Sequence, residues 1–260
     1  MARYDLHTHL FTTWEQGRYS LERAGRDADY IIGAVKSAKL DGIALVNFED
    51  IRFEEFAASA RGHLGRYRLM REIGNALSFT DEESVFRVIR GQEIPTLQGH
   101  VLALAGDSFR RIPSGLGLKE TLKQIANLGA VAIADHYKNL QGVGIKNLVE
   151  NSASFQGYEQ FNANFEIVPR EDFTELFRHG LNGISVSDSH NKRDLGNGHV
   201  ETELDFSSED SLRDSLKEKI NSGRFIAAMR KRNSLFSVAE HAGIALYDSW
   251  ARKRFKWLED

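Results

Sequence analysis

The feature that most constrains the fold of this chain is a sustained alternation of short apolar runs with longer amphipathic stretches. The apolar runs lie at residues 3–6, 42–48, 84–91, 100–105, 129–135, 155–161, 182–187 and 199–206. Apolar residues with helical spacing occupy 27–42, 53–77, 117–129, 169–180 and 207–223. Strands that alternate with helices along a whole chain indicate parallel β/α units, arranged as a barrel or as an open sheet.

Local signals predict where several of these elements begin and end. Pro169 suits the first turn of a helix, and Gly180 suits its end. Ser207 with Asp210 resembles a capping box, and Gly223 closes the same helix.

Two segments depart from the simple alternation. In residues 85–105, two apolar runs are joined by a short polar turn, which predicts a hairpin-like irregularity. Residues 225–260 are expected to form a helical tail packed on the rest of a single domain, with a strand at 225–229 left open.

The bulk composition excludes several classes of protein. The chain has 260 residues, of which 41% are hydrophobic, so it can build a large core. Its net charge of −3 gives no global attraction to nucleic acid or membrane, and no stretch is long enough to span a bilayer. Without cysteine, a metal site must use His, Asp or Glu. With no secretory signal at the N-terminus, we expect a cytoplasmic protein.

Two histidines one residue apart follow the first apolar run. On a strand, alternate side chains share a face, so His7 and His9 are expected to point the same way. Asp188 and His190 repeat this spacing after the run at 182–187. Imidazole and carboxylate together suit Zn, Mn or Fe(II).

The other metal-capable residues also follow or open apolar runs. They are Glu49, Glu93, His100 and His136. In barrels and open parallel sheets the site is built at the carboxyl ends of the strands, so these segments are expected to converge there. The remaining histidines lack this placement, and we interpret them as surface or helix-capping residues: His63, His179, His199 and His241.

Five motifs occur in a fixed order along the chain: YDLHTHL, GQEI, GHVLAL, IADHYK and SVSDSHNKRDLG. In order and spacing this set resembles the PHP (polymerase and histidinol phosphatase) superfamily, from residue 3 to about residue 224. The resemblance implies a distorted (β/α)7 TIM-like barrel over residues 1–224, with up to three divalent metal ions (Zn, Mn or Fe) at the carboxyl ends of the strands. It implies hydrolysis of phosphomonoesters or phosphodiesters by a metal-bridging hydroxide.

The resemblance also assigns ligands. For the first ion these are His7, His9, Glu93 and Asp188; for the second they are Glu93, as a bridge, with His100 and His136. His190 matches a ligand of the third ion, whose usual partners are altered here, so Glu15 and Glu49 are the possible third-metal ligands.

The catalytic candidates are Glu93, Asp188 and His190, the last two for the proton of the leaving group. Lys138, Lys192 and Arg193 closely follow metal-candidate residues and are the phosphate-binding candidates.

The residues and the resemblance together predict metal-dependent phosphoester hydrolysis. The substrate would be a small phosphorylated metabolite, a nucleotide or a short nucleic acid. The alternative is a catalytically degraded PHP-like scaffold or nucleic-acid-binding subunit, which the altered residues 47–49 favour. A metal-dependent C–N hydrolase ranks lower, because no apolar run ends in lysine. The oligomeric state is left open.

Overall fold

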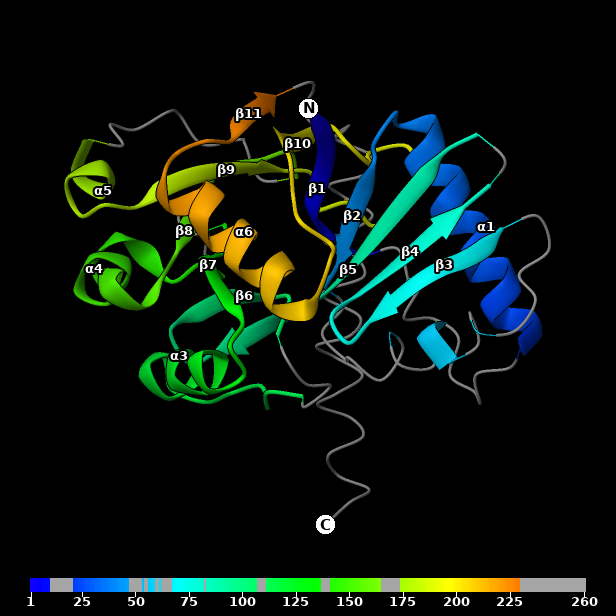
Figure 1. Cartoon of the computed structure of the whole chain (residues 1–260). Helices are drawn as coiled ribbons and strands as arrows, with labels where there is room; N and C mark the ends of the chain where they lie inside the picture. The colour runs from blue at the N-terminus through cyan, green and yellow to red at the C-terminus, as the bar shows by residue number, and fades with distance from the viewer. Residues whose placement is uncertain are drawn as a thin grey trace, which may run out of the picture.

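In the computed structural model, one mixed β-sheet organises the chain (Figure 1). The structure describes residues 1–9, 21–46, 53, 56–58, 61, 67–81, 83–106, 111–136, 141–164 and 174–229. The strands are β1 (Ala2–Thr8), β2 (Gly42–Leu45), β3 (Arg68–Ile73), β4 (Ala76–Thr80), β5 (Val85–Thr96), β6 (Gly99–Leu104), β7 (Val131–Ala134), β8 (Gly157–Asn162), β9 (Asn182–Val186), β10 (Gly198–Thr202) and β11 (Ile226–Met229). The helices are α1 (Leu21–Ser37), α3 (Leu118–Asn127), α4 (Gly144–Glu150), α5 (Thr174–Arg178) and α6 (Glu209–Asn221).

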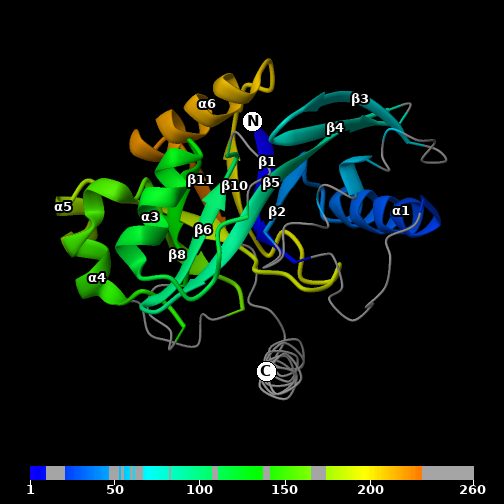
Figure 2. The same cartoon turned by 90° about the horizontal axis from the view of Figure 1, so that it is seen from below.

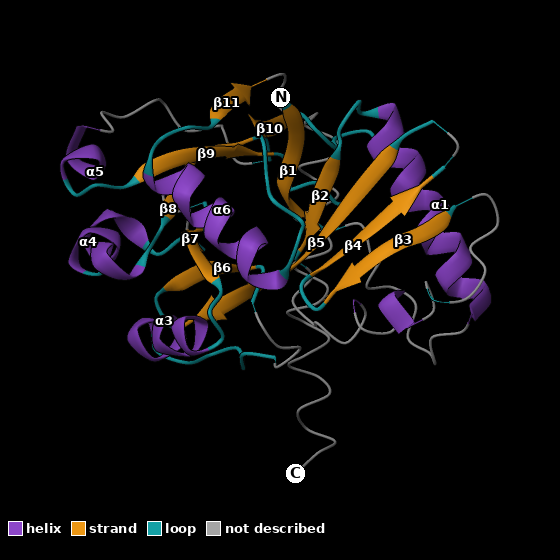
Figure 3. Ribbon diagram, viewed as in Figure 1, coloured by secondary structure: helices purple, strands orange, loops and turns teal. Residues whose placement is uncertain are grey.

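The central strands form a nearly closed barrel, which confirms the expected distorted (β/α)7 architecture. The order is β1-β2-β5-β6-β7-β8-β9, seven strands of the described chain. All neighbours in this order are parallel except β6, which is antiparallel to both β5 and β7. The barrel closes where Thr8 forms a parallel bridge with Ser189 and the His9 amide donates to the Ser189 carbonyl at 2.8 Å. Strands β10 and β11 extend the sheet beside β1 (Figure 3).

Helices cover the barrel from several sides (Figure 2). α1 packs its apolar face on residues of β2, β4 and β5 in one buried cluster. α3 packs against β6 and β7 in a second cluster. α6 contributes Leu212, Leu216 and Ile220 to a third cluster, shared with the buried side chains of β1 and β9. Each such buried side chain stabilises the fold by about 1.5–3 kcal/mol.

The irregularity expected at residues 85–105 is a β5–β6 hairpin, as predicted. Thr96 pairs with Gly99, which leaves Leu97 and Gln98 as the turn. Gly99 has a φ of +130°, and a Cβ atom there would lie 2.3 Å from the Gly142 backbone. A glycine is therefore required where the hairpin meets the segment before α4.

The prediction of a helix over residues 53–77 is wrong in its C-terminal part. Residues 68–80 form the antiparallel β3–β4 hairpin, in which Ile73 pairs with Ala76 across a Gly74-Asn75 turn. A Gly-Asn pair between two apolar runs is a two-residue hairpin signal. Here the turn overrides the helical spacing of the flanking residues.

The boundaries of α6 are close to those expected, with one correction. Ser208, and not Ser207, is the N-cap: its Oγ accepts a hydrogen bond from the Ser211 amide at 3.0 Å. Gly223 follows the helix with a φ of +64°, the conformation that favours glycine at a helix end.

The sheet continues past residue 224, because β11 pairs with β10. The remainder of the expected tail, residues 230–260, lies outside the described residues. His199 on β10 is buried, so its interpretation as a surface residue is wrong. Within the described chain, no helix combines the length and the apolar character needed to cross a membrane.

Candidate metal centre

His7 and His9 lie at the end of β1, and their rings face the same space inside the barrel. Their Nε2 atoms are 3.0 Å apart. The intervening Thr8 side chain turns away and donates to the Ala44 carbonyl at 2.7 Å. Both imidazoles are buried. The alternation that the sequence predicted for the two histidines therefore holds.

Glu93 at the end of β5 lies between the two groups of histidines. Its Oε2 atom is 3.1 Å from Nε2 of His9 and 3.8 Å from Nε2 of His7. Its Oε1 atom is 2.5 Å from Nδ1 of His100 on β6 and 3.5 Å from Nε2 of His136, which follows β7. The two carboxylate oxygens thus face different sets of imidazoles, which is the arrangement of a bridging carboxylate.

Asp188 and His190 reach the same space, although not by sharing a strand face. β9 ends at Val186, and Asp188 has a left-handed φ of +50°. Asp188 Oδ1 lies 3.4 Å from Nε2 of His7 and 3.5 Å from Nε2 of His9. The His190 ring stacks on His9 with centroids 4.4 Å apart. A non-glycine residue at positive φ carries backbone strain, and such strain concentrates at functional sites.

A buried carboxylate that sequence reasoning missed holds the opposite side of His7. Oε1 of Glu159 on β8 accepts a hydrogen bond from Nδ1 of His7 at 2.6 Å. Its Oε2 accepts from the His136 amide at 2.9 Å and from the Asn162 side chain at 2.8 Å. Glu159 therefore ties β1 and β7 to β8 and turns Nε2 of His7 toward the cluster, as carboxylates commonly do for metal-binding histidines.

A second missed carboxylate, Asp135, lies between the same groups. Its Oδ1 atom is 3.4 Å from Nδ1 of His7, and its Oδ2 atom is 3.2 Å from Nε2 of His136. Glu159 and Asp135 each interrupt or end an apolar run, which is the one signal in the sequence that marks them. A charged residue inside a buried strand must be paired or bound to a metal.

The ionisable groups of the cluster shift one another's pKa values. Burial by itself would lower the pKa of His7. Three nearby carboxylates outweigh burial and raise that pKa well above its ordinary value: those of Asp135, Asp188 and Glu159. Burial acts to raise the pKa of Glu93, but the hydrogen bond and charge of His100, together with hydrogen bonds from His136 and His7, outweigh it and lower the pKa well below its usual range.

Burial, followed by the nearby charge of Glu159, raises the pKa of Asp135 well above its usual range. Among the described residues, the ion pairs of Glu93, Asp135 and Glu159 are all with histidines. A site of buried carboxylates and imidazoles of this kind is electrostatically suited to cations.

Three groups of side chains in the described chain place their ligand atoms within 4.8 Å of one another. They are His7, His9 and Asp188; Glu93, His100, Asp135 and His136; and His7, Asp135 and Glu159. The fit to divalent ions is supported by the Asp135 carboxylate, which is fully buried and accepts no hydrogen bond from a described residue. The donor set of imidazole nitrogens and carboxylate oxygens suits Zn, Mn or Fe(II).

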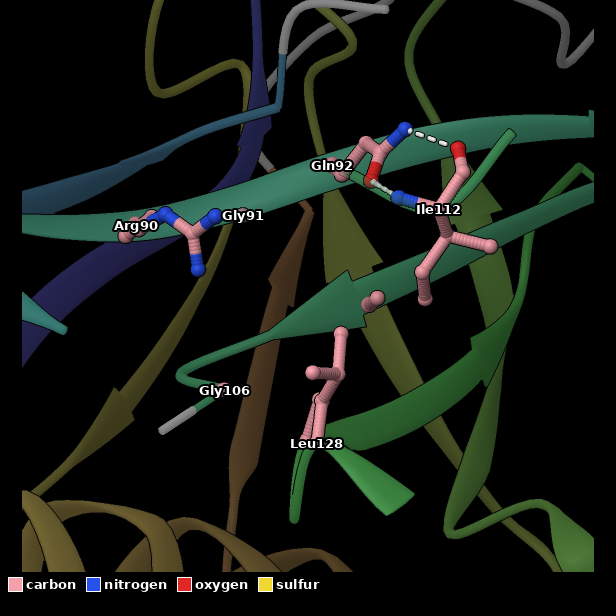
Figure 4. A pocket seen from close by; sticks show the side chains of 8 residues that line it. Arg90, Gly91, Gln92, Gly106, Ile112 and Leu128 are labelled. Atoms are coloured by element: carbon pink, nitrogen blue, oxygen red, sulfur yellow. Dashed lines mark hydrogen bonds between the residues drawn. The ribbon is translucent and has the colours of Figure 1, made fainter. Parts of the chain in front are cut away.

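A side-chain clamp on the outer face of β5 fixes the strand at the position of Glu93. Gln92 donates to the Ile112 carbonyl at 2.8 Å and accepts from the Ile112 amide at 3.0 Å (Figure 4). The clamp borders a cavity of about 10 Å³ that is also lined by Arg90 and Leu128, about the space that one water needs. Since neighbouring strand residues face opposite ways, holding Gln92 outward holds Glu93 inward.

Two of the three phosphate-binding candidates lie in the described part of the chain, and both are exposed. Lys192 and Arg193 follow His190 in an exposed loop. The Lys192 amide donates to the Tyr30 hydroxyl at 3.1 Å, and the Arg193 amide donates to the Asn191 side chain at 3.0 Å. The loop backbone is thus anchored while both cationic side chains are exposed. Three candidates lie outside the described residues: Glu15, Glu49 and Lys138.

Comparisons with known proteins agree with this picture. Residues 176–219 match the family model described as PHP-associated. No curated protein matches the chain. PsfC from Pseudomonas syringae PB-5123 has a similar structure, with a TM-score of 0.60 and 14% identity over 96% of this chain and 100% of PsfC.

Two further solved structures share the fold. A two-domain protein from Bacteroides vulgatus ATCC 8482, containing a predicted PHP-like metal-dependent phosphoesterase, aligns with a TM-score of 0.54 and 16% identity over 88% of this chain and 65% of that one. The lesion-specific endonuclease PfuEndoQ from Pyrococcus furiosus aligns with a TM-score of 0.52 and 13% identity over 84% of this chain and 56% of the endonuclease. The chain thus spans less than two thirds of these two proteins. Residues 176–219 are thus similar to the PHP-associated family, and the chain shares its barrel fold with these solved structures.

Proposed function

We propose that this chain is a metal-dependent phosphoesterase that hydrolyses a phosphomonoester or a phosphodiester. The observation that carries the proposal is the convergence of buried ligand groups from β1, β5 and the end of β9. Nε2 of His7 and the Asp188 carboxylate are 3.4 Å apart, and each lies within 4 Å of Nε2 of His9. The Glu93 carboxylate lies within 4 Å of both histidines. These four residues span most of the chain, so only the fold brings them together.

The residues present define where divalent ions would bind. His7, His9, Glu93 and Asp188 would hold the first, and Glu93, His100 and His136 the second. His190 would belong to a third, with Glu15 and Glu49 as its further candidates. Such ions, whether Zn, Mn or Fe, supply a water of lowered pKa and neutralise charge on phosphoryl oxygens.

The chain's own residues would orient these groups and manage the protons. Glu159 holds His7 through Nδ1, so the ring presents Nε2 to the cluster. Nδ1 of His190 lies 3.2 Å from the Asp188 carbonyl oxygen, so Nδ1 donates there and Nε2 is left for one of two roles. Nε2 would bind the third ion or, without that ion, would hold and deliver the proton of the leaving group. The Asp188 carboxylate is the second candidate for this role. Lys192, Arg193 and Lys138 would bind the phosphate from the rim.

Two observations bear on the substrate class: the positive charge of residues 224–260 and the fold shared with an endonuclease. A phosphorylated metabolite, a nucleotide and a short nucleic acid all carry the required phosphoryl group. The fold shared with a lesion-specific endonuclease supports the inclusion of nucleic acid. Residues 224–260 hold eight Lys or Arg and four Asp or Glu, a local excess of four positive charges that would attract a polyanion.

A metal-reconstituted activity panel tests the proposal. Chelator-treated protein is reloaded separately with Mn²⁺, Zn²⁺ or Fe²⁺ and offered a chromogenic phosphomonoester, its diester and short oligonucleotides. We expect hydrolysis of at least one class that disappears in EDTA. Protein that binds ions but hydrolyses none of these substrates contradicts the proposal. A metal content below one ion per chain, after purification without chelator, favours a PHP-like scaffold or a nucleic-acid-binding subunit.

A further inference from the structure

Asp135 is a fully buried carboxylate that no described N–H or O–H group satisfies. Neither of its oxygens accepts a hydrogen bond from the described part of the chain. Instead, the two oxygens face Nδ1 of His7 at 3.4 Å and Nε2 of His136 at 3.2 Å. Both distances are long for hydrogen bonds to a carboxylate.

Asp5 shows how this fold satisfies a buried carboxylate that has no metal function. Asp5 is as fully buried as Asp135. Its two oxygens accept hydrogen bonds from the amides of Ser187, at 3.1 Å, and Gly196, at 2.9 Å. Asp135 has no equivalent donors among the described residues, so a different positive group must compensate its burial.

The ligand-type side chains around Asp135 favour a bound cation as that group. Ligand atoms of Glu93, His100, Asp135 and His136 all lie within 4.8 Å of one another. Nδ1 of His7 is already engaged with Glu159 at 2.6 Å, so it is not available to a metal on that side. Oδ2 of Asp135 lies 3.2 Å from Nε2 of His136, which is itself a member of the group that includes Glu93.

We propose that Asp135 is a fourth protein ligand of the ion held by Glu93, His100 and His136. This rests on the proposed function, and it adds a ligand that the PHP resemblance does not supply. Four protein ligands leave a tetrahedral ion no open position, so an ion that accepts more ligands, such as Mn²⁺ or Fe²⁺, suits this position better than Zn²⁺.

The competing explanation is that Asp135 is a neutral acid that donates its proton to Glu159. Asp135→Asn separates the two, because an amide replaces a neutral acid as a donor but is a poor ligand for a hard cation. The matched control is Asp5→Asn, an identical change at a buried carboxylate that lies outside the cluster. Circular dichroism and thermal unfolding establish that both variants fold.

The measurement is the number and the affinity of ions bound to chelator-treated protein, titrated with Mn²⁺ alone against a competing indicator. We expect the wild-type chain and Asp5→Asn to bind at least two ions. Asp135→Asn should lose one of them or bind it at least about tenfold more weakly, since even partners that only orient a ligand are worth 10–100-fold. If Asp135→Asn binds both ions as tightly as the wild type, the fourth-ligand assignment is overturned while the proposed function survives. If the wild-type chain binds no ion, both the fourth-ligand assignment and the proposed function are contradicted.

A crystal of the wild-type protein with Mn²⁺, located by anomalous scattering, decides the question if Asp135→Asn does not fold. An Asp135 oxygen within about 2.5 Å of an ion supports the assignment, because metal–carboxylate bonds are about 2.0–2.2 Å long. An ion bound by Glu93 and His136 with Asp135 more than about 3 Å away overturns it.

Discussion

Nδ1 of His7 donates to Oε1 of Glu159 over 2.6 Å, and this contact decides which nitrogen of His7 faces His9, Glu93 and Asp188. The ring is fixed with Nε2 3.0 Å from Nε2 of His9. Glu159 also receives the His136 amide at 2.9 Å, so one carboxylate sets the position of groups on two strands. The geometry of the cluster therefore depends on a residue that would not itself hold an ion in the first site.

Replacing Glu159 with Gln should weaken metal binding without unfolding the protein. The amide keeps the size of the side chain, but it holds His7 less firmly and lowers the basicity of its ring. We expect a 10–100-fold loss in affinity for the first ion, measured by titration of chelator-treated protein with Mn²⁺. Glu150→Gln, on the exposed side of α4, is the control and should match the wild type. Unchanged affinity in Glu159→Gln would exclude the orienting role.

Glu93→Gln should remove most of the activity. Its two oxygens face both groups of imidazoles, so the neutral amide removes a shared charge from two ions at once. We expect kcat/KM to fall by at least about 100-fold, which corresponds to about 3 kcal/mol of transition-state stabilisation. Metal content by elemental analysis should fall as well. Full activity together with full metal content would show that the site is assigned wrongly.

Lys192→Ala should act on substrate binding and leave the chemical step nearly unchanged. The side chain is exposed at the rim, so its attraction to a phosphate is screened by solvent. We expect KM to rise by up to about fivefold, equal to about 1 kcal/mol, with kcat nearly constant. Steady-state kinetics at low and high salt measure this. Lys123→Ala on α3 serves as the comparison, and an equal change in both variants would count against a specific phosphate contact.

The pH dependence of stability should reveal the buried Asp5. Burial raises the pKa of Asp5 from 3.8 to about 6. The folded state therefore binds this proton more tightly than the unfolded state does, so its stabilising contribution is present below pH 4 and is lost as the pH rises through 6. Relative to Asp5→Asn, the wild-type free energy of unfolding should fall by about 1 kcal/mol between pH 5 and 7.5. Urea unfolding in EDTA at several pH values tests this, and parallel curves for the two proteins would refute it.

Asn75 should be important for attaching the β3–β4 hairpin to the rest of the barrel. Its buried side-chain amide donates to the Ala105 carbonyl and to the Glu209 carbonyl, each at 3.1 Å. Asn75→Ala leaves both carbonyls without this donor and should lower the free energy of unfolding by about 1–3 kcal/mol. Urea denaturation measures the change. Gln124→Ala on α3 should alter stability far less, and equal losses would contradict the assignment.

The sequence predicted the elements whose signal is local. The apolar runs around residues 43, 102 and 133 became buried strands, because their spacing and length are those of a barrel interior. The β5–β6 hairpin was also predicted, because a short polar turn joins its two apolar runs. The β3–β4 hairpin was not recognised, because helical spacing in residues 53–77 outweighed the Gly74-Asn75 turn in the interpretation.

The site was predicted in part. His7, His9, Glu93, His100, His136, Asp188 and His190 lie together in the structure, although their roles as metal ligands stay predictions. Asp188 arrives there through a left-handed backbone and not through a continuing strand. Glu15, Glu49 and Lys138 stay predictions that the described residues do not address.

By itself, the sequence determined the strand–helix alternation, the inventory of imidazoles and carboxylates at strand ends, and the absence of thiol ligands. These are properties of neighbouring residues, and periodicity and chemistry reveal them directly. Only the tertiary structure decided that Glu159 orients His7 and that Asp135 is buried between His7 and His136. The contacts of His7 with Glu159 and with Asp135 join residues more than 120 positions apart, and the barrel closure that brings them together depends on strand register and packing across the whole sheet.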